Sequence, residues 1–282
     1  MIDLNYFNQF IDNAFKEDIG DGDHTSLACI PSMNEGKARL LIKESGIVAG
    51  VEVAEYTFRR FDPFMRVNTF IGDGEKVSPG DVVFTVEGRV LSILQCERLV
   101  LNLMQHMSGI ATQTHRYVEK IAGTNAKLLD TRKTTPGMRL LDKEAVRIGG
   151  GTNHRTGLYD MILIKDNHVD FAGGIEKAID TVNKYLQKRG KMLKIEIEAR
   201  NLDEVQRIVK HNQIQRIMLD NFDIETTRKA VEIVNGHYEV ESSGNINLDN
   251  IRDYASCGVD FISVGALTHR VKSLDMSLKA VE

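Results

Sequence analysis

Cationic and hydrogen-bonding side chains gather between residues 130 and 168 of this 282-residue chain. One group, DTRKTTPG at 130–137, follows a short apolar run, and another, LIKDNH at 163–168, ends a second run. Between them, three glycines at 149–151 lead into TNHR at 152–155. Arginine and lysine form charge-assisted hydrogen bonds with carboxylates and phosphates, and the planar arginine fork suits a carboxylate. The pattern predicts an anion pocket with Arg132, Arg155 and Lys165 as donors.

Polar groups also stand at the ends of the later apolar runs. LKIEIEA at 193–199 ends in Glu198, and RIMLDN at 216–221 ends in Asp220 and Asn221. YEVESSGN at 238–245 ends in Glu241, Ser242, Ser243, Gly244 and Asn245. In parallel α/β proteins, ligands bind at the carboxyl ends of the strands, where loops collect polar side chains. A helix cap explains one such end, but a whole series of them indicates a shared active site.

The acids and small residues of this series suggest particular ligands. Glu198 and Asp220 fall on neighbouring predicted strands, which suits one hydrated Mg²⁺ that also contacts substrate phosphates. The loops SSGN at 242–245 and VGAL at 264–267 precede short predicted helices, so their backbone N–H groups suit a terminal phosphate. Neither GxxxxGK[ST] nor GxGxxG occurs in the sequence.

Simpler interpretations exist for several of these residues. Glu196 and Glu198 fit a solvated strand face, and Asp220 fits the cap of the next helix. His168 fits a core histidine bonded to backbone. His154 follows the glycines and adjoins Arg155, which favours a functional role over a structural one.

The elements that position these residues follow a strand–helix rhythm from residue 126 onward. Such repeats predict a parallel sheet, either a barrel or an open doubly wound sheet, and too few strands are visible for an eightfold barrel. Apolar runs predict strands at 126–129, 161–164, 193–197, 216–219, 238–240 and 260–264. Amphipathic patterns predict helices at about 173–188, 201–211, 223–235 and 247–256.

The preceding part of the chain has a different pattern. We predict a helix at 4–17, strands at 37–43, 65–71 and 82–87, and a helical stretch from Leu91 to Ser108–Gly109 that resumes through Ile121. The domain boundary is therefore expected near 105–110, giving an amino-terminal domain of 1–108 and a catalytic domain of 109–282. The last residues are free to pack back on the first domain.

Composition excludes several classes of protein. The chain is 42% hydrophobic and 27% charged, which is typical of a globular enzyme, and its net charge of −4 argues against a nucleic-acid-binding surface. The start lacks a signal-peptide pattern, and no apolar run approaches the roughly 18 residues of a membrane span. Three widely spaced cysteines show neither zinc spacing nor a disulfide framework, so we expect a cytoplasmic protein.

The motifs together resemble those of one family, the quinolinate phosphoribosyltransferases, or decarboxylating nicotinate-nucleotide pyrophosphorylases of NAD biosynthesis. The similar segments of the second part, in order, are DTRKTTPG (130–137), RIGGGTNHRTGLYD (147–160), LIKDNH (163–168), IEIEA (195–199), MLDN (218–221), ESSGN (241–245) and SVGALTH (263–269). Those of the first part are EDIGDGDHTS (17–26), GIVAG (46–50) and ERLVLNLMQHMSGIAT (97–112). His24 and Asn245 depart from the usual family pattern, where an aliphatic residue and often a glycine stand.

The resemblance implies a fold and a reaction. The fold would be α/β, an amino-terminal α/β sandwich followed by an incomplete, about six-stranded parallel α/β barrel. The enzyme would transfer phosphoribosyl from 5-phosphoribosyl 1-pyrophosphate to quinolinate, giving nicotinate mononucleotide, pyrophosphate and CO₂, with Mg²⁺ as cofactor. No nucleic acid or membrane partner is implied.

The resemblance also implies roles for individual residues. The quinolinate carboxylates would be bound by Arg132, His154, Arg155 and Lys165, and by Arg98 donated by the partner subunit of a homodimer. Thr131 would be a further substrate-binding residue. The catalytic residues would be Lys133 and Lys165, facing the pyrophosphate-bearing substrate, and Glu198 and Asp220, holding the ribose hydroxyls and the metal, the latter through water. The 5′-phosphate site would be lined by Ser243, Gly244, Asn245, Val264, Gly265 and Ala266.

Three other functions are compatible with parts of this pattern. A related phosphoribosyltransferase acting on another base would use the same anion-binding residues. A Schiff-base lyase would use Lys165 or Lys133 as a partly neutral amine. A binding protein without activity would keep the shape, although the intact set of charged residues argues against it.

Overall fold

The computed structural model describes residues 4–281, which form two compact units interleaved along the chain. The first unit contains the described residues up to 115, residues 135–150 and those from 270 onward, and the second contains 116–134 and 151–269. Each unit is therefore assembled from segments far apart in sequence. Across the described residues, no helix combines the length and the apolar character that crossing a membrane requires.

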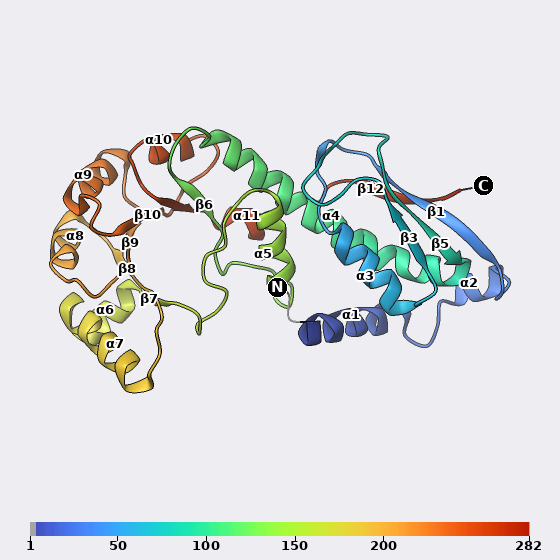
Figure 1. Ribbon diagram of the computed structural model, residues 1–282, viewed down its shortest axis with the longest axis horizontal. Helices are drawn as coiled ribbons and strands as arrows, with labels where there is room; N and C mark the ends of the chain where they lie inside the picture. The colour runs from blue at the N-terminus through green and yellow to red at the C-terminus, as the bar shows by residue number, and fades with distance from the viewer. Residues whose placement is uncertain (1–3, 282) are drawn as a thin grey trace. The chain divides into compact units, whose positions relative to one another are not determined.

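The first unit is built on an antiparallel sheet with strand order β12-β1-β5-β3 (Figure 1). Alternate residues of β1 are buried, as the predicted half-exposed strand requires, and the last strand, β12, pairs with β1 so that Leu278 lies opposite Leu40. The elements of this unit are α1 (Leu4–Ile19), α2 (His24–Cys29), β1 (Glu35–Ile42), β2 (Gly46–Ile47), α3 (Val51–Phe61), β3 (Arg66–Thr69), β4 (Lys76–Val77), β5 (Val82–Arg89), α4 (Val90–Lys120), whose last turn lies in the second unit, α5 (Arg139–Ile148) and β12 (Met276–Val281).

Helix α4 corrects one prediction, because it passes through Ser108 and Gly109 without the expected pause. Glycine weakens a helix interior by about 1 kcal/mol relative to alanine, so the sequence pattern pointed to a break. A Cβ on Gly109 would lie 2.4 Å from the carbonyl oxygen of Lys272. The glycine therefore permits a close approach of the carboxyl-terminal segment to a continuous helix.

The second unit is a parallel sheet of six strands in the order β6-β11-β10-β9-β8-β7. The sheet is open, with β6 and β7 at its edges, and it confirms the incomplete barrel expected from the sequence. Helices α7 to α10 lie along its outer side (Figure 1). Its elements are β6 (Lys127–Leu129), β7 (Ile162–Ile164), α6 (Asp166–Ala172), α7 (Ile175–Arg189), β8 (Ile195–Ala199), α8 (Leu202–Val209), β9 (Arg216–Asp220), α9 (Ile224–Val234), β10 (Glu239–Ser243), α10 (Ile251–Ala255), β11 (Phe261–Ser263) and α11 (Ala266–His269).

The strands of this sheet are buried on both faces, which corrects the solvated-face interpretation of IEIEA. All five residues of β8 are buried, and Glu196 is fully inaccessible. Because side chains alternate along a strand, Ile195 and Ile197 share one face while Glu196 and Glu198 share the other. The two glutamates therefore point to the side of the sheet that carries the polar network described below, and not to solvent.

Candidate active site

A short segment beside β6 begins the site. Thr152 makes a parallel β-bridge with Leu129, its N–H donates to the carbonyl of Leu128 at 2.8 Å, and its carbonyl accepts from the Asp130 N–H at 3.2 Å. The fully buried carboxylate of Asp130 then accepts a 2.8 Å hydrogen bond from the backbone N–H of His154. The segment 152–154 is thus held along the edge of the sheet at the carboxyl end of β6.

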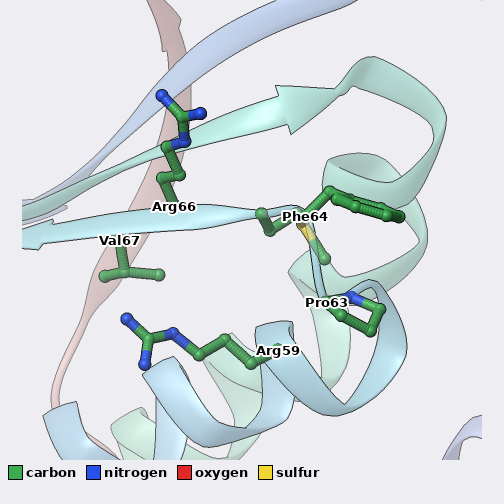
Figure 2. Close-up of a pocket in the computed structure, with 6 residues that line it drawn as sticks. Arg59, Pro63, Phe64, Arg66 and Val67 are labelled. Atoms are coloured by element: carbon green, nitrogen blue, oxygen red, sulfur yellow. The ribbon is translucent and has the colours of Figure 1, made fainter.

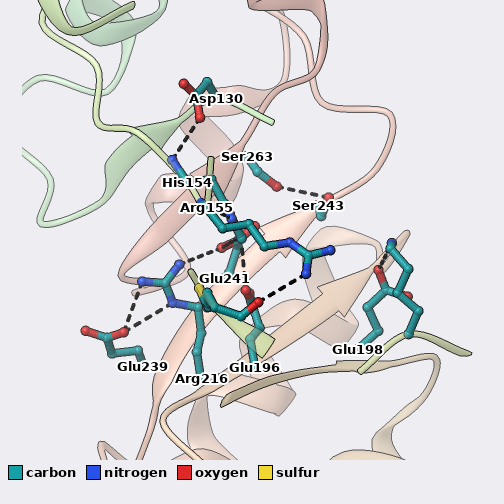
Figure 3. Close-up of polar contacts among 12 residues, drawn as sticks. Asp130, His154, Arg155, Glu196, Glu198, Arg216, Glu239, Glu241, Ser243 and Ser263 are labelled. Carbon is teal, nitrogen blue, oxygen red and sulfur yellow. Dashed lines mark hydrogen bonds and ion pairs between the residues drawn. The ribbon is translucent and has the colours of Figure 1, made fainter. Parts of the chain in front are cut away.

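The His154 side chain points into the interior of the sheet and is only 6% exposed. Its Nε2 lies 3.0 Å from Oε2 of Glu196 and 3.5 Å from Oε2 of Glu241, as Figure 3 shows. Burial disfavours a charge here, but the two carboxylates outweigh it and raise the pKa of His154 to about 9. Nδ1 accepts the Arg155 N–H at 2.7 Å. This hydrogen bond opposes the rise in the pKa of His154, because it uses the lone pair that a second proton would occupy. In both protonation states Nε2 carries a proton toward the glutamates.

The two glutamates are neutralised by an arginine from the strand between them. Nη1 of Arg216 donates to Oε2 of Glu241 at 2.9 Å, and its Nη2 lies 3.0 Å from Oε2 of Glu239 (Figure 3). The guanidinium also stacks 3.8 Å from the centre of the Phe261 ring. Burial and the neighbouring Glu241 raise the pKa of Glu196, whereas His154 and Arg216 overcome burial to lower the pKa of Glu241. Glu241 stands at a strand end that the sequence marked as polar, but it was assigned no role, and no sequence pattern singled out Arg216.

Arg155 and Arg132 form the cationic part of the site. Nη1 of Arg155 donates to the carbonyl of Met161, immediately before β7, at 3.2 Å. Burial and the nearby Arg132 guanidinium lower the pKa of Arg155. Two guanidinium groups that repel each other at a partly buried site favour an anion between them. Arg132 and Lys133 are exposed in the loop that follows β6, where the Lys133 N–H donates to Oγ1 of Thr131 at 3.1 Å.

Lys165 and Glu198 pair at the ends of β7 and β8. Nζ of Lys165 lies 2.6 Å from Oε1 of Glu198, and the Asp166 N–H donates to Oε2 of the same carboxylate at 3.3 Å. The pair is half open, since the lysine side chain is 46% exposed while the glutamate is 8% exposed. The core-histidine interpretation of His168 is wrong: its exposed ring accepts the Lys165 N–H through Nδ1 at the start of α6.

Asp220 stands at the end of β9 and is tied to the loop after β10. The cap interpretation of Asp220 is wrong, because Asp223 caps α9 by accepting the Thr226 N–H at 2.7 Å. Instead, Oδ2 of Asp220 accepts from the Asn221 amide at 3.0 Å, and the same amide accepts from Nδ2 of Asn245 at 3.0 Å.

Gly244 fits between these groups only because it lacks a side chain. A Cβ on Gly244 would lie 2.2 Å from Oδ1 of Asn221, and its φ of +93° is itself unfavourable for other residues. The neighbouring Ser243 accepts at Oγ the hydroxyl of Ser263 at 3.0 Å. The ends of β10 and β11 therefore meet in a tight arrangement of small residues.

The loop after β11 lies against the loop after β6. The Thr268 hydroxyl donates to the Lys133 carbonyl at 2.8 Å, and a Cβ on Gly265 would lie 3.0 Å from the Lys133 side chain. Val264 is buried and donates its N–H to the Leu129 carbonyl at 3.0 Å, and Ala266 begins α11. Lys133 is thus next to the glycine expected at the phosphate end of the site.

The remaining predicted residue, Arg98, is exposed on α4 in the first unit. That unit also contains a pocket of about 380 Å³ (Figure 2), but none of the predicted site residues lines it. Its walls are Arg59, Pro63, Phe64, Met65, Arg66 and Val67.

These features define a class of protein, an α/β enzyme that binds an anionic substrate at the carboxyl ends of parallel strands. The family model described as "Quinolinate phosphoribosyl transferase, C-terminal domain" matches residues 110–279, and the corresponding N-terminal domain model matches 23–108. The chain belongs to the quinolinate phosphoribosyl transferase family.

Individual relatives agree with this assignment. A quinolinate phosphoribosyltransferase [decarboxylating] from Nicotiana tabacum is 46% identical over 94% of this chain and 80% of its own length. A probable nicotinate-nucleotide pyrophosphorylase [carboxylating] from Synechocystis is 42% identical over 94% and 89%. The solved structure of NadC from Streptococcus pyogenes has a TM-score of 0.94 at 35% identity, covering 100% of this chain and 99% of that one.

Proposed function

We propose that this chain transfers phosphoribosyl from 5-phosphoribosyl 1-pyrophosphate to quinolinate, with decarboxylation, to give nicotinate mononucleotide, pyrophosphate and CO₂. The observation that carries the proposal is that Lys165 and Glu198 pair at the carboxyl ends of β7 and β8, with Arg155 near enough to be affected by the Glu198 charge, in a chain of this family. The positive groups that would bind the dicarboxylate therefore lie next to the carboxylate that would face the ribose.

Quinolinate is bound by the cationic side of the site in this proposal. Its adjacent carboxylates need two sources of positive charge close together, and Arg132 and Arg155 are near enough to affect each other electrostatically. His154 lies beneath the two arginines, and Lys165 completes the set at the end of β7. Thr131 stands beside Arg132 in the same loop, and we assign it to substrate binding there.

The phosphoribosyl substrate lies toward Glu198 and Asp220. Loss of pyrophosphate from the ribose builds positive charge on the sugar and negative charge on the leaving group. Carboxylates near the sugar and the ammonium groups of Lys133 and Lys165 stabilise both charges because they are already oriented. The small residues Ser243, Gly244, Asn245, Val264, Gly265 and Ala266 leave room for the 5′-phosphate against backbone N–H groups.

Decarboxylation requires little from the protein once the ring nitrogen is bonded to the ribose. The quaternised ring accepts the electron pair left by CO₂, so no acid, base or nucleophile of the chain has to act on that carbon. The residues of the site hold the two substrates in register and keep the charges paired. A Schiff base at Lys165 would instead have to break the 2.6 Å ion pair with Glu198.

The carboxylates present also fit a magnesium ion held through water. Hard oxygen ligands suit this ion, and it keeps most of its waters. One oxygen of Glu198 is taken by Lys165 and the other by the Asp166 N–H, so direct coordination by Glu198 would disrupt existing contacts. We therefore assign Asp220 and Glu198 to water-mediated contact. When bound, Mg²⁺ neutralises the pyrophosphate group.

The proposal includes a homodimer in which Arg98 of one subunit completes the other subunit's quinolinate site. Two observations support this. Arg98 is exposed on α4, and a third guanidinium would add a charge-assisted donor to the pair formed by Arg132 and Arg155. We also propose a cytoplasmic location, because Cys29, Cys96 and Cys257 are all free thiols, as expected in a reducing compartment.

The test is turnover by the purified protein. Quinolinate and phosphoribosyl pyrophosphate with Mg²⁺ should yield nicotinate mononucleotide and release CO₂ from carboxyl-labelled quinolinate. Nicotinate offered in parallel measures the competing function, a phosphoribosyltransferase for another base. Turnover of nicotinate without turnover of quinolinate would refute the proposal.

A further inference from the structure

The polar groups buried beneath the site form a connected network on the inner side of the sheet. We propose that Glu196, Arg216 and Glu241 form a positioning unit that fixes His154, and through it Arg155, for binding of a dicarboxylate. The inference rests on the proposed function and adds to it residues that contact no reacting atom.

The network links the segment beside β6 to central strands with which that segment does not pair in the sheet. Glu196 lies on β8, Arg216 on β9 and Glu241 on β10, whereas His154 belongs to the segment beside β6, at the opposite edge of the sheet from β7. A closed barrel would fix that segment by a complete ladder. In this open sheet, the contacts of Nε2 of His154 with Glu196 and Glu241 reach the central strands directly (Figure 3).

Arg155 follows His154 in the chain, so its position depends on that of His154. The Arg155 N–H donates to Nδ1 of His154, and its guanidinium reaches the Met161 carbonyl before β7 at 3.2 Å. Each end of this residue is therefore bonded to a group whose position is set by another part of the sheet. A rotation of the His154 ring would remove the partner of the Arg155 N–H.

Each carboxylate of the unit faces a cation or an N–H group. Glu241 uses one oxygen, Oε2, for both Nη1 of Arg216 at 2.9 Å and Nε2 of His154 at 3.5 Å. Glu196 lies opposite Arg216 in the strand register, and its Oε2 is 3.0 Å from Nε2 of His154. Removing the charge of one carboxylate leaves Arg216 and the Nε2–H of His154 with one negative partner fewer, and the His154 ring, held at the sheet's edge, is the group most easily displaced.

Stability alone is a poor explanation for these charges. Replacing a buried ion cluster with apolar residues of similar volume is often neutral or stabilising, since the desolvation of the ions is costly. Phe261, a half-buried residue that stacks on Arg216, shows that a large apolar side chain fits beside this cluster. An orienting role accounts for ions beneath the segment that carries the predicted quinolinate ligands His154 and Arg155.

Glu196→Gln tests the unit because it removes the charge and keeps the shape. We expect the KM for quinolinate to rise about tenfold or more, while the KM for phosphoribosyl pyrophosphate stays within about twofold. The matched control is Glu239→Gln, since Glu239 also pairs with Arg216 but is half open to solvent and makes no contact with His154 in the described structure. The control should leave both KM values unchanged.

The outcomes separate the two proposals. Failure of the wild-type protein to convert quinolinate would refute the proposed function. Wild-type turnover with equal KM changes for both substrates, or with a fall in melting temperature alone, would overturn the positioning role. If Glu196→Gln does not fold, a crystal structure of the wild-type protein with quinolinate decides, because Nε2 of His154 must still face Glu196 and a ring turned away contradicts the inference.

Discussion

At the scale of single residues, Lys165 and Glu198 show how one ion pair serves both halves of the proposed reaction. The 2.6 Å contact keeps the lysine next to the acid while leaving it 46% exposed to an incoming anion. Pyrophosphate or a carboxylate then competes for the ammonium group, which leaves Glu198 free to face the sugar. The exposed Lys165 thus binds the anion, and the buried Glu198 stabilises the positive charge on the sugar.

Glu198→Gln should slow the chemical step more than it weakens binding. Loss of the carboxylate removes a negative charge near the sugar, so we expect kcat to fall about a hundredfold. The KM for quinolinate should change much less. Steady-state kinetics check this, with Glu225→Gln as the control, because Glu225 makes a 2.6 Å ion pair with Lys229 on the surface. A Glu198→Gln protein with wild-type kcat would contradict the role.

Asp62 should contribute stability that depends on pH. Its side chain is 1% exposed and accepts from Arg89 at 2.8 Å and from Ser92 at 2.7 Å. Burial opposes the charge, but these bonds outweigh it and lower the pKa of Asp62 below its ordinary 3.8. A lowered folded-state pKa means that the contribution is complete above the unfolded pKa and is lost as pH falls through the folded one.

Asp62→Asn therefore should cost about 2 kcal/mol at pH 7, a figure reduced because Arg89 is largely exposed. The difference from the wild type should shrink as the pH falls below 3.8. Urea unfolding of both proteins at pH 7 and near pH 3 measures it. An equal difference at both pH values would show that the charge is not responsible.

At the scale of elements, agreement between prediction and structure depended on whether local pattern or tertiary contact decides an element. The predicted strand at 161–164 is β7 and the predicted helix at 223–235 is α9, because each repeats apolar residues at its own period. Helix α5, by contrast, lay in a segment interpreted through its flanking motifs. Asp142 of this helix is fully buried against His106 at 2.7 Å, a contact that no local pattern reveals.

Gly109 in α4 gives a prediction that reverses the usual effect of alanine. Gly→Ala in an exposed helix stabilises it by about 1 kcal/mol, but here the new Cβ would meet the Lys272 carbonyl at 2.4 Å. We expect Gly109→Ala to lower the free energy of unfolding by about 1–3 kcal/mol. Asn102→Ala, at an exposed position of the same helix, should be neutral or stabilising in the same urea titration. A stabilised Gly109→Ala protein would refute the close approach.

At the scale of the whole molecule, the proposed dimer predicts that two defective proteins complement each other. Arg98→Ala and Glu198→Gln place their defects in one site of a mixed dimer and leave the other site intact. Random mixing should restore activity to about a quarter of wild type, since about half of the dimers are mixed. Activity measured after joint refolding or coexpression checks this, and no gain over the separate variants would exclude donation of Arg98 across an interface.

The sequence by itself determined the chemistry available at each strand end. Short apolar runs fixed where strands stop, and the residues that follow them, such as Arg132, Lys165 and Asp220, fixed which charges collect there. This worked because strand ends are a local property, set by where the apolar residues give way to polar ones. The family motifs lie at the same positions.

The tertiary structure alone decided which charged residues are buried together. A strand's period of two places Glu196 with Glu198, but it does not say whether their face meets solvent or another strand. Register and sheet curvature bring Arg216, Glu241 and His154 to that face from separate segments. Those contacts depend on distances between elements far apart in the chain, which residue spacing does not contain.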